Sequence, residues 1–195
     1  MGEESHNKMA PTLRLDELRK LKENTIIKKK AAVMVLFYPD KKQEVNLLLM
    51  LRETYKGVHS NQVGFPGGKV EKIDKNLLET ALRETYEEVG VPPNRVETIR
   101  ELSTIYIPPS NFEVQPYVGL YRNPLPFVLE IAEVASLIEV PLSDFMNDEN
   151  IISENLSTSY ATNIDVPAFK LNGYVVWGAT AMIMSELKEL LKQLL

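Results

Sequence analysis

The chain has 195 residues, 44% of them hydrophobic, which is ample for one domain with a packed core. There is no cysteine, so disulfides, zinc–thiolate sites and thiol nucleophiles are excluded. Lys and Arg number 22 against 27 Asp and Glu, and the net charge of −5 leaves no basic surplus for nonspecific binding of nucleic acid.

The N-terminal part is expected to be an extension over residues 1–24. Residues 1–8 are polar, so they do not form a secretory signal, and we expect them to be disordered. Leucines at 13, 15, 18 and 21 predict a short helix. No apolar run approaches the roughly 20 residues of a membrane span. We therefore expect a cytoplasmic protein with no membrane partner, whose oligomeric state the sequence leaves open.

The first predicted strands form a hairpin. Residues 31–38 are a nearly unbroken apolar run, which predicts a strand buried on both faces. Residues 45–51 predict the next strand, and residues 40–44 the loop between the two. Residues 111–121 alternate between apolar and polar side chains and predict a further strand. Because Pro116 has no N–H to donate, this strand is expected at a sheet edge or a bulge.

The C-terminal third predicts a short helix leading into a strand over 130–140, a last strand over 174–177 and a last helix over 180–195. The inward face of that helix is expected to carry Ile183, Leu187, Leu190, Leu191 and Leu194. No internal repeat or low-complexity linker is present. This order of elements predicts an α/β domain over residues 25–195, a mixed β-sheet sandwiched between α-helices.

A cluster of carboxylates marks the helix predicted over residues 75–89, which Gly90 is expected to end as a glycine cap. Glu84, Glu87 and Glu88 fall within an arc of roughly 100° on this helix, whereas Leu78, Leu82, Thr85 and Val89 form a separate, core-facing stripe. Oxygen ligands of this kind suit Mg²⁺ or Mn²⁺. The alternative is a solvated acidic face without function, which is common on exposed helices.

The residues around this cluster resemble a known signature. Gly68, Asp74, Arg83-Glu84, Glu87-Glu88 and Gly90 are similar to the Nudix box, found in hydrolases of nucleoside diphosphates linked to another moiety. The common box has Glu where this chain has Asp74, and seven residues instead of eight before Arg-Glu. We expect the preceding loop to absorb the extra residue. The box covers about residues 68–91, and the resemblance implies a Nudix fold.

The resemblance also implies roles for residues of the box. Glu84 and Glu88 are expected to be the main metal ligands, completed by Glu87 and by a backbone carbonyl at Gly67 or Gly68. A bound Mg²⁺ or Mn²⁺ would polarise a phosphoryl oxygen and acidify a water.

Two further roles concern the proton transfer. Arg83 is expected to orient Glu87 as an i,i+4 pair. Glu87 and Glu133 compete for the role of general base, and the alternative for Glu130 and Glu133 is that they are plain exposed helix residues.

A wider resemblance concerns the substrate. The segments 48–52 and 65–69, read as Leu-Leu-Met-Leu-Arg and Phe-Pro-Gly-Gly-Lys, are similar to the coenzyme A pyrophosphatase branch of the Nudix family, as are residues 107–112 and 176–181. The branch usually has a small residue, a second Arg and a Gly at the positions of Glu53, Gly57 and Asn61. The resemblance implies hydrolysis of coenzyme A or its thioesters to 3′,5′-ADP and a phosphopantetheine product.

The cations expected to bind the substrate are Arg52 and Lys69 for the diphosphate, beside Gly67, and Lys56 for the 3′-phosphate. A surface ion pair is the alternative for Arg52. Phe65 and Trp177 are expected in the core. The small-molecule nucleotide remains open between coenzyme A and another dinucleotide such as ADP-ribose or NADH. A noncatalytic, nucleotide-binding sensor is the third hypothesis, although it has no need of the carboxylate cluster.

Overall fold

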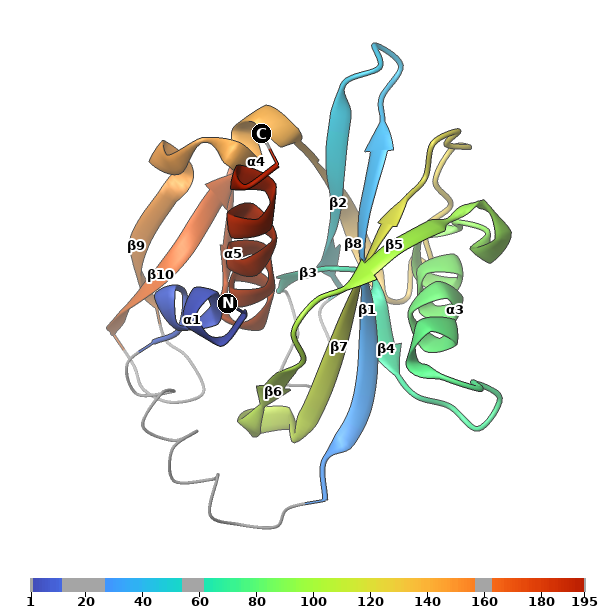
Figure 1. Ribbon diagram of the computed structural model, residues 1–195, viewed down its shortest axis with the longest axis horizontal. Coiled ribbons are helices and arrows are strands. Elements are labelled where there is room, and N and C mark those ends of the chain that lie inside the picture. The colour runs from blue at the N-terminus through green and yellow to red at the C-terminus, as the bar shows by residue number, and fades with distance from the viewer. Residues whose placement is uncertain (1, 12–26, 54–61, 157–162, 195) are drawn as a thin grey trace.

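The computed structural model describes residues 2–11, 27–53, 62–156 and 163–194 (Figure 1). An eight-stranded mixed sheet lies between α3 on one side and α5 with α1 on the other. A three-stranded antiparallel sheet stands beside α5, in the order β11–β10–β9. The layers confirm the predicted α/β class. No helix among the described residues is long and apolar enough to cross a membrane.

The larger sheet has the strand order β3–β2–β1–β7–β5, with β4 paired to β1, β6 to β7 and β8 to β2. Its strands are β1 (Lys29–Pro39), β2 (Val45–Arg52), β3 (Val63–Gly64), β4 (Gly67–Lys69), β5 (Glu97–Glu101), β6 (Ile105–Ile107), β7 (Phe112–Leu120) and β8 (Val134–Pro141). The smaller sheet comprises β9 (Ile151–Leu156), β10 (Ile164–Leu171) and β11 (Tyr174–Trp177).

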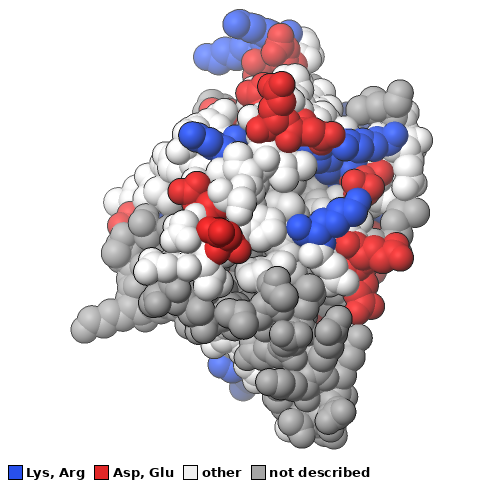
Figure 2. Space-filling model, turned by 90° about the vertical axis from the view of Figure 1, so that its left-hand side faces the viewer, with Lys and Arg blue, Asp and Glu red and all other residues white. Residues whose placement is uncertain are grey.

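Among the described residues the α-helices are α1 (Gly2–Lys8), α3 (Leu77–Val89), α4 (Leu142–Met146) and α5 (Gly178–Lys192). Short 3₁₀ turns, η1 (Pro93–Arg95), η2 (Pro108–Ser110) and η3 (Asp148–Asn150), join the strands. On the face seen in Figure 2, which is the left-hand side of Figure 1, acidic and basic side chains are interspersed.

Strand β1 divides the interior into two cores because successive side chains point to opposite faces. Val35 and Phe37 belong to the core beneath α5, whereas Met34 and Leu36 belong to the core beneath α3. All four are buried, which confirms the prediction of a strand covered on both sides. The hairpin between β1 and β2 is also confirmed, since the two strands pair antiparallel with Pro39 opposite Val45.

Helix α3 begins and ends where local chemistry dictates. Asn76 caps its N-terminus, the side chain accepting a hydrogen bond of 2.9 Å from Glu79 N. At the other end Gly90 adopts φ 74°, and its N–H donates to the Tyr86 carbonyl. Glycine takes this left-handed conformation without strain, so the glycine cap predicted there is confirmed. The helix starts two residues later than predicted because Asn76 is the cap.

The expectation that Pro116 lies at a sheet edge or a bulge is wrong, because β7 pairs with β1 in unbroken register through Pro116. Strand β7 lies inside the sheet, parallel to β1 and antiparallel to β5 and β6. The Pro116 carbonyl accepts from Leu102 N, so this residue faces the break between β5 and β6. Because the pairing with β7 is interrupted at that break, no backbone N–H is needed there from Pro116. The irregularity of the sheet lies between β5 and β6, not in β7.

Three further expectations are corrected. Residues 2–8 are helical, because α1 packs against α5 and His6 Nε2 lies 2.9 Å from Glu186 Oε2. Residues 131–133 form a turn instead of a helix before β8. Leu194 lies beyond the end of α5 and is exposed. The helix predicted around residues 13–21 lies outside the described residues.

Candidate active site

A cleft of about 850 Å³ opens beside β4 and the box helix. One end is acidic, and its floor is formed by apolar residues of β1 and β7. Of the predicted site residues, the cleft is lined by Arg52, Gly67, Gly68, Lys69, Arg83, Glu84, Glu87, Glu88 and Glu133. Lys56, Gly57 and Asn61 lie outside the described residues. The fold therefore brings together the box on α3, the end of β2 and the turn before β8.

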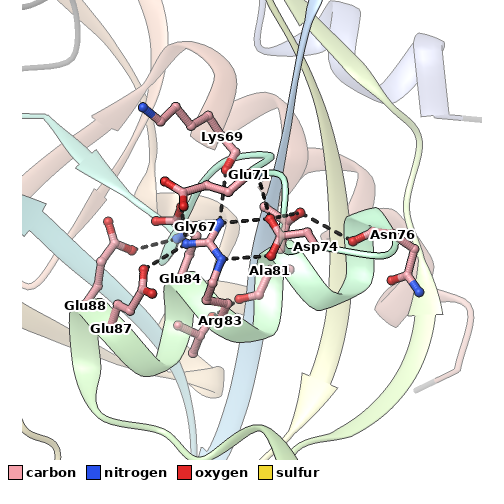
Figure 3. Close-up of polar contacts among 12 residues, drawn as sticks. Gly67, Lys69, Glu71, Asp74, Asn76, Ala81, Arg83, Glu84, Glu87 and Glu88 are labelled. Atoms are coloured by element: carbon pink, nitrogen blue, oxygen red, sulfur yellow. Dashed lines mark hydrogen bonds and ion pairs between the residues drawn. The ribbon is translucent and has the colours of Figure 1, made fainter.

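Arg83 joins the parts of the box (Figure 3). Its guanidinium donates to both carboxylate oxygens of Asp74, to Glu84 at 2.9 Å, to Glu87 at 2.8 Å and to the Lys69 carbonyl at 3.1 Å. The hydrogen bonds from Arg83 hold the pKa of Asp74 well below its usual range. The expected i,i+4 pair with Glu87 is present, and Asp74 fixes the guanidinium from the other side.

Glu88 is the most buried carboxylate of the cluster, with 1% of the residue exposed. Its Oε2 accepts a 2.7 Å hydrogen bond from Gly67 N. Its Oε1 lies 3.1 Å from Arg52 Nη2 but receives no hydrogen bond of favourable geometry. Burial raises the pKa of Glu88 to about 7, despite the neighbouring Arg52 and the Gly67 N–H.

Glu84 lies against Gly68, where a Cβ atom would overlap its carboxylate. Glycine is therefore required at this position by the close approach of a side chain from α3. Burial also raises the pKa of Glu84, although Arg83 opposes the effect. Ionisation of both α3 carboxylates is thus unfavourable in this environment, which favours a nearby cation.

The donor set fits a hard divalent cation. Glu88 Oε1 is buried and lacks a hydrogen bond, Glu84 is desolvated, and the Gly67 carbonyl faces the same space. Within the part of the chain described, no three His, Cys, Asp or Glu side chains converge closely enough to hold a metal by themselves, since Arg83 and Arg52 engage the carboxylates. Mg²⁺ commonly uses one or two carboxylates together with waters and substrate phosphates, so this set suffices.

Arg52 does not form the surface ion pair that was the alternative for it. Its guanidinium donates to the Gly67 carbonyl at 2.7 Å and lies beside buried Glu88. Among the described residues Arg52 is thus the cation that contacts the buried carboxylate, with 23% of its side chain exposed. Lys69 is exposed, and Figure 3 shows its side chain extending away from the cluster.

Glu133 lies in the turn before β8 instead of on a helix. It is exposed, lines the cleft, and its charge contributes to the raised pKa values of Glu84 and Glu88. Its backbone carbonyl accepts from Glu53 N at 2.8 Å, which fastens the turn to the end of β2. Glu133 and Glu87 both line the cleft.

Some lining residues were not predicted. Trp177 lines the cleft and is half-buried, whereas Phe65 is buried in the core as expected. Ile107 and Phe112 line the floor, and Glu71 lies beyond Lys69. The sequence signals that could have indicated these lining residues are the alternation of residues 112–120 and the neighbouring 107–112 motif. Strand pairing is needed to show which face of the strand meets the cleft.

Comparison with known proteins identifies the family. The family model described as NUDIX domain matches residues 28–146, more than half of the chain. The chain belongs to the Nudix family. It is 33% identical over 175 residues to the protein named Uncharacterized Nudix hydrolase NudL of Enterobacter sp. (strain 638), covering 86% of this chain and 85% of that protein. The protein of the same name in Yersinia pestis (strain Pestoides F) is 35% identical over 155 residues, 75% of this chain and 72% of the relative.

Solved Nudix structures show the same fold at low identity. The Nudix hydrolase RenU of M. smegmatis aligns with a TM-score of 0.58 at 15% identity, over 86% of this chain and 88% of that chain. The MutT protein of Methanosarcina mazei Go1 aligns with a TM-score of 0.55 at 16% identity, over 87% and 99%. With the family established, this Nudix protein is a pyrophosphohydrolase of nucleoside diphosphate substrates, and members of the family generally use divalent metal ions.

Proposed function

We propose that this Nudix protein hydrolyses the diphosphate linkage of coenzyme A or its thioesters, giving 3′,5′-ADP and a phosphopantetheine product, with Mg²⁺ or Mn²⁺. The observation that carries the hydrolytic part is the buried Glu88 oxygen without a hydrogen bond, in a cleft beside Glu84 and the Gly67 carbonyl. The coenzyme A part rests on the similarity of residues 48–52 and 65–69 to that branch.

The metal would be held by Glu84, Glu88 and a carbonyl of Gly67 or Gly68, with Glu87 able to contribute directly or through a water. When bound, it supplies charge neutralisation for the diphosphate and acidifies a water. The chain's own task is then to hold the diphosphate in the cleft and to accept a proton. We expect Arg52 to bind the phosphates, since it lies beside the buried carboxylate and its planar guanidinium suits two-point contact.

Proton removal would fall to Glu87 or Glu133. The water attacks a phosphorus of the diphosphate, one bridging P–O bond breaks, and the carboxylate takes the proton that the water loses. Arg83 holds Glu87 at 2.8 Å, so Arg83 is a positioning residue for that carboxylate. The variants Glu87→Gln and Glu133→Gln separate the two, since removing the base lowers kcat by roughly 10²–10⁴-fold whereas removing a bystander does not.

A substrate panel tests the proposal. Coenzyme A, dephospho-coenzyme A, ADP-ribose, NADH and diadenosine polyphosphates are assayed at equal concentration with Mg²⁺ and with Mn²⁺. We expect coenzyme A to be the best substrate, with dephospho-coenzyme A cleaved roughly tenfold less efficiently, the equivalent of about 1.4 kcal/mol for one charged contact. Faster cleavage of ADP-ribose than of coenzyme A would overturn the proposal and favour the other dinucleotides.

A further inference from the structure

Strand β1 changes from apolar to basic at the edge of the cleft. Val33 and Ala31 line the cleft, and Lys29 is the next residue on the same face of the strand. In the adjacent strands, Lys69 lies opposite Ala31 and Phe112 lies opposite Lys29. Lys29 and Lys69 are therefore diagonal neighbours on one face, with Cα atoms about 7–8 Å apart. Their long side chains can meet over a single anion.

Neither of these lysines has a carboxylate partner among the described residues. Within residues 27–53, 62–156 and the other described segments, no carboxylate, Glu71 included, lies within ion-pairing distance of Lys29 or Lys69. The neighbouring lysines differ: Lys28 Nζ lies 2.9 Å from Glu113 Oε1, and Lys30 pairs with the other oxygen of that carboxylate. Glu113 points to the opposite face of β7 from Phe112. Among the described residues, Glu113 thus pairs with the lysines outside the cleft, whereas Lys29 and Lys69 on the cleft face have no acidic partner.

The surroundings of Lys29 add a second recognition element. Its Nζ lies 5.6 Å from the centre of the Phe112 ring, which keeps the ammonium over the cleft floor. Ile107, Pro109 and Val114 extend this floor as an apolar surface. A flat apolar group could rest there while an anion meets the lysines. Glu84, Glu88 and Lys69 therefore line the cleft, and Lys29 lies beside its floor with its ammonium over the Phe112 ring.

We propose that Lys29 and Lys69 form a subsite for a phosphomonoester of the substrate, separate from the diphosphate held at the carboxylate end. This rests on the proposed function, in which the phosphomonoester is the 3′-phosphate of coenzyme A. In this subsite Lys69 contacts the 3′-phosphate instead of the diphosphate. Lys29 takes the role of binding the 3′-phosphate that was expected for Lys56. Two ammonium groups beside one phosphate dianion supply charge-assisted hydrogen bonds that a ribose hydroxyl cannot make as strongly.

Calorimetric binding of two nucleotides that differ only in this group tests the subsite. 3′,5′-ADP and 5′-AMP are titrated, in Mg²⁺, into the wild type, Lys29→Met, Lys69→Met and the double variant. The wild type should bind 3′,5′-ADP roughly tenfold more tightly than 5′-AMP. Each single variant should lower that ratio to about threefold, and the double variant to near one. Lys30→Met is the matched control because Lys30 is adjacent in sequence but faces Glu113, and it should keep the wild-type ratio.

A wild-type ratio near one, or an unchanged ratio in the double variant, would overturn the subsite. Lys29→Arg should retain most of the preference for 3′,5′-ADP over 5′-AMP, because arginine keeps the positive charge. A purely structural role of Lys29 would not require this result. Failure of the proposed function is recognised separately, from the hydrolysis rates of coenzyme A and ADP-ribose in the wild type. Cleavage of coenzyme A in preference to ADP-ribose, with a binding ratio insensitive to both lysines, would refute the subsite alone.

Discussion

Replacing Glu88 by glutamine should change how stability depends on pH. Burial raises the pKa of Glu88 from 4.5 to about 7, so ionising it in the folded protein costs about 3 kcal/mol more than in the unfolded chain. This carboxyl favours folding most below pH 4.5, where it is protonated in both states. That contribution is lost as the pH rises to 7. The amide of the variant does not titrate and has no such dependence.

The measurement is the free energy of unfolding by urea, in EDTA, from pH 4 to pH 8. The stability of Glu88→Gln relative to the wild type should rise by about 3 kcal/mol across this range. Changes in other titrating groups largely cancel in this difference. Loss of the Arg52 contact shifts the whole curve but not its slope in this window, because arginine stays protonated throughout.

Metal supplies the second arm of the same experiment. At a Mg²⁺ concentration a hundredfold above its Kd, the wild type should gain about 2.7 kcal/mol, whereas Glu88→Gln should gain far less at that concentration and lose turnover. Equal stabilisation of both proteins by Mg²⁺ would show that Glu88 is not a ligand. A stability difference that stays flat with pH in EDTA would refute the argument that Glu88 ionises at a cost.

Three further changes probe the box and its helix. Arg83→Ala should reduce turnover well beyond twofold while Mn²⁺ still binds, because Glu87 loses its orientation; activity within twofold of wild type would make Arg83 an ordinary ion-pairing residue. Gly68→Ala should weaken Mn²⁺ binding, measured by electron paramagnetic resonance, more than tenfold, since the added methyl displaces Glu84; unchanged affinity would exclude Glu84 as a ligand. Asn76→Ala should lower the free energy of unfolding by about 1 kcal/mol with little change in kcat, and a neutral result would contradict its capping role.

Local chemistry made much of the fold predictable. The apolar run before Pro39 predicted a strand covered on both faces, and β1 is that strand. Gly90 predicted the end of the box helix, because few other residues adopt its left-handed conformation without cost. These features depend on side-chain periodicity and backbone sterics within a few residues, and such information is contained in the sequence itself.

Strand pairing explains where sequence reasoning failed. Pro116 lies in an interior strand because the break between β5 and β6 happens to face its missing N–H, and that break belongs to a different segment. The polar helix α1 was expected to be disordered, but His6 finds Glu186, 180 positions along the chain. Neither partner can be identified from residues close in sequence.

The same division holds for the candidate site. Helical periodicity shows which carboxylates share a face of the box helix, and the motif shows which family chemistry they resemble. Folding is needed to bury Glu88 against Gly67, to bring Arg52 beside it, and to set Lys29 and Lys69 on the same face of the sheet. Burial and charge compensation arise between segments that meet through folding, whereas helical periodicity is a property of one segment.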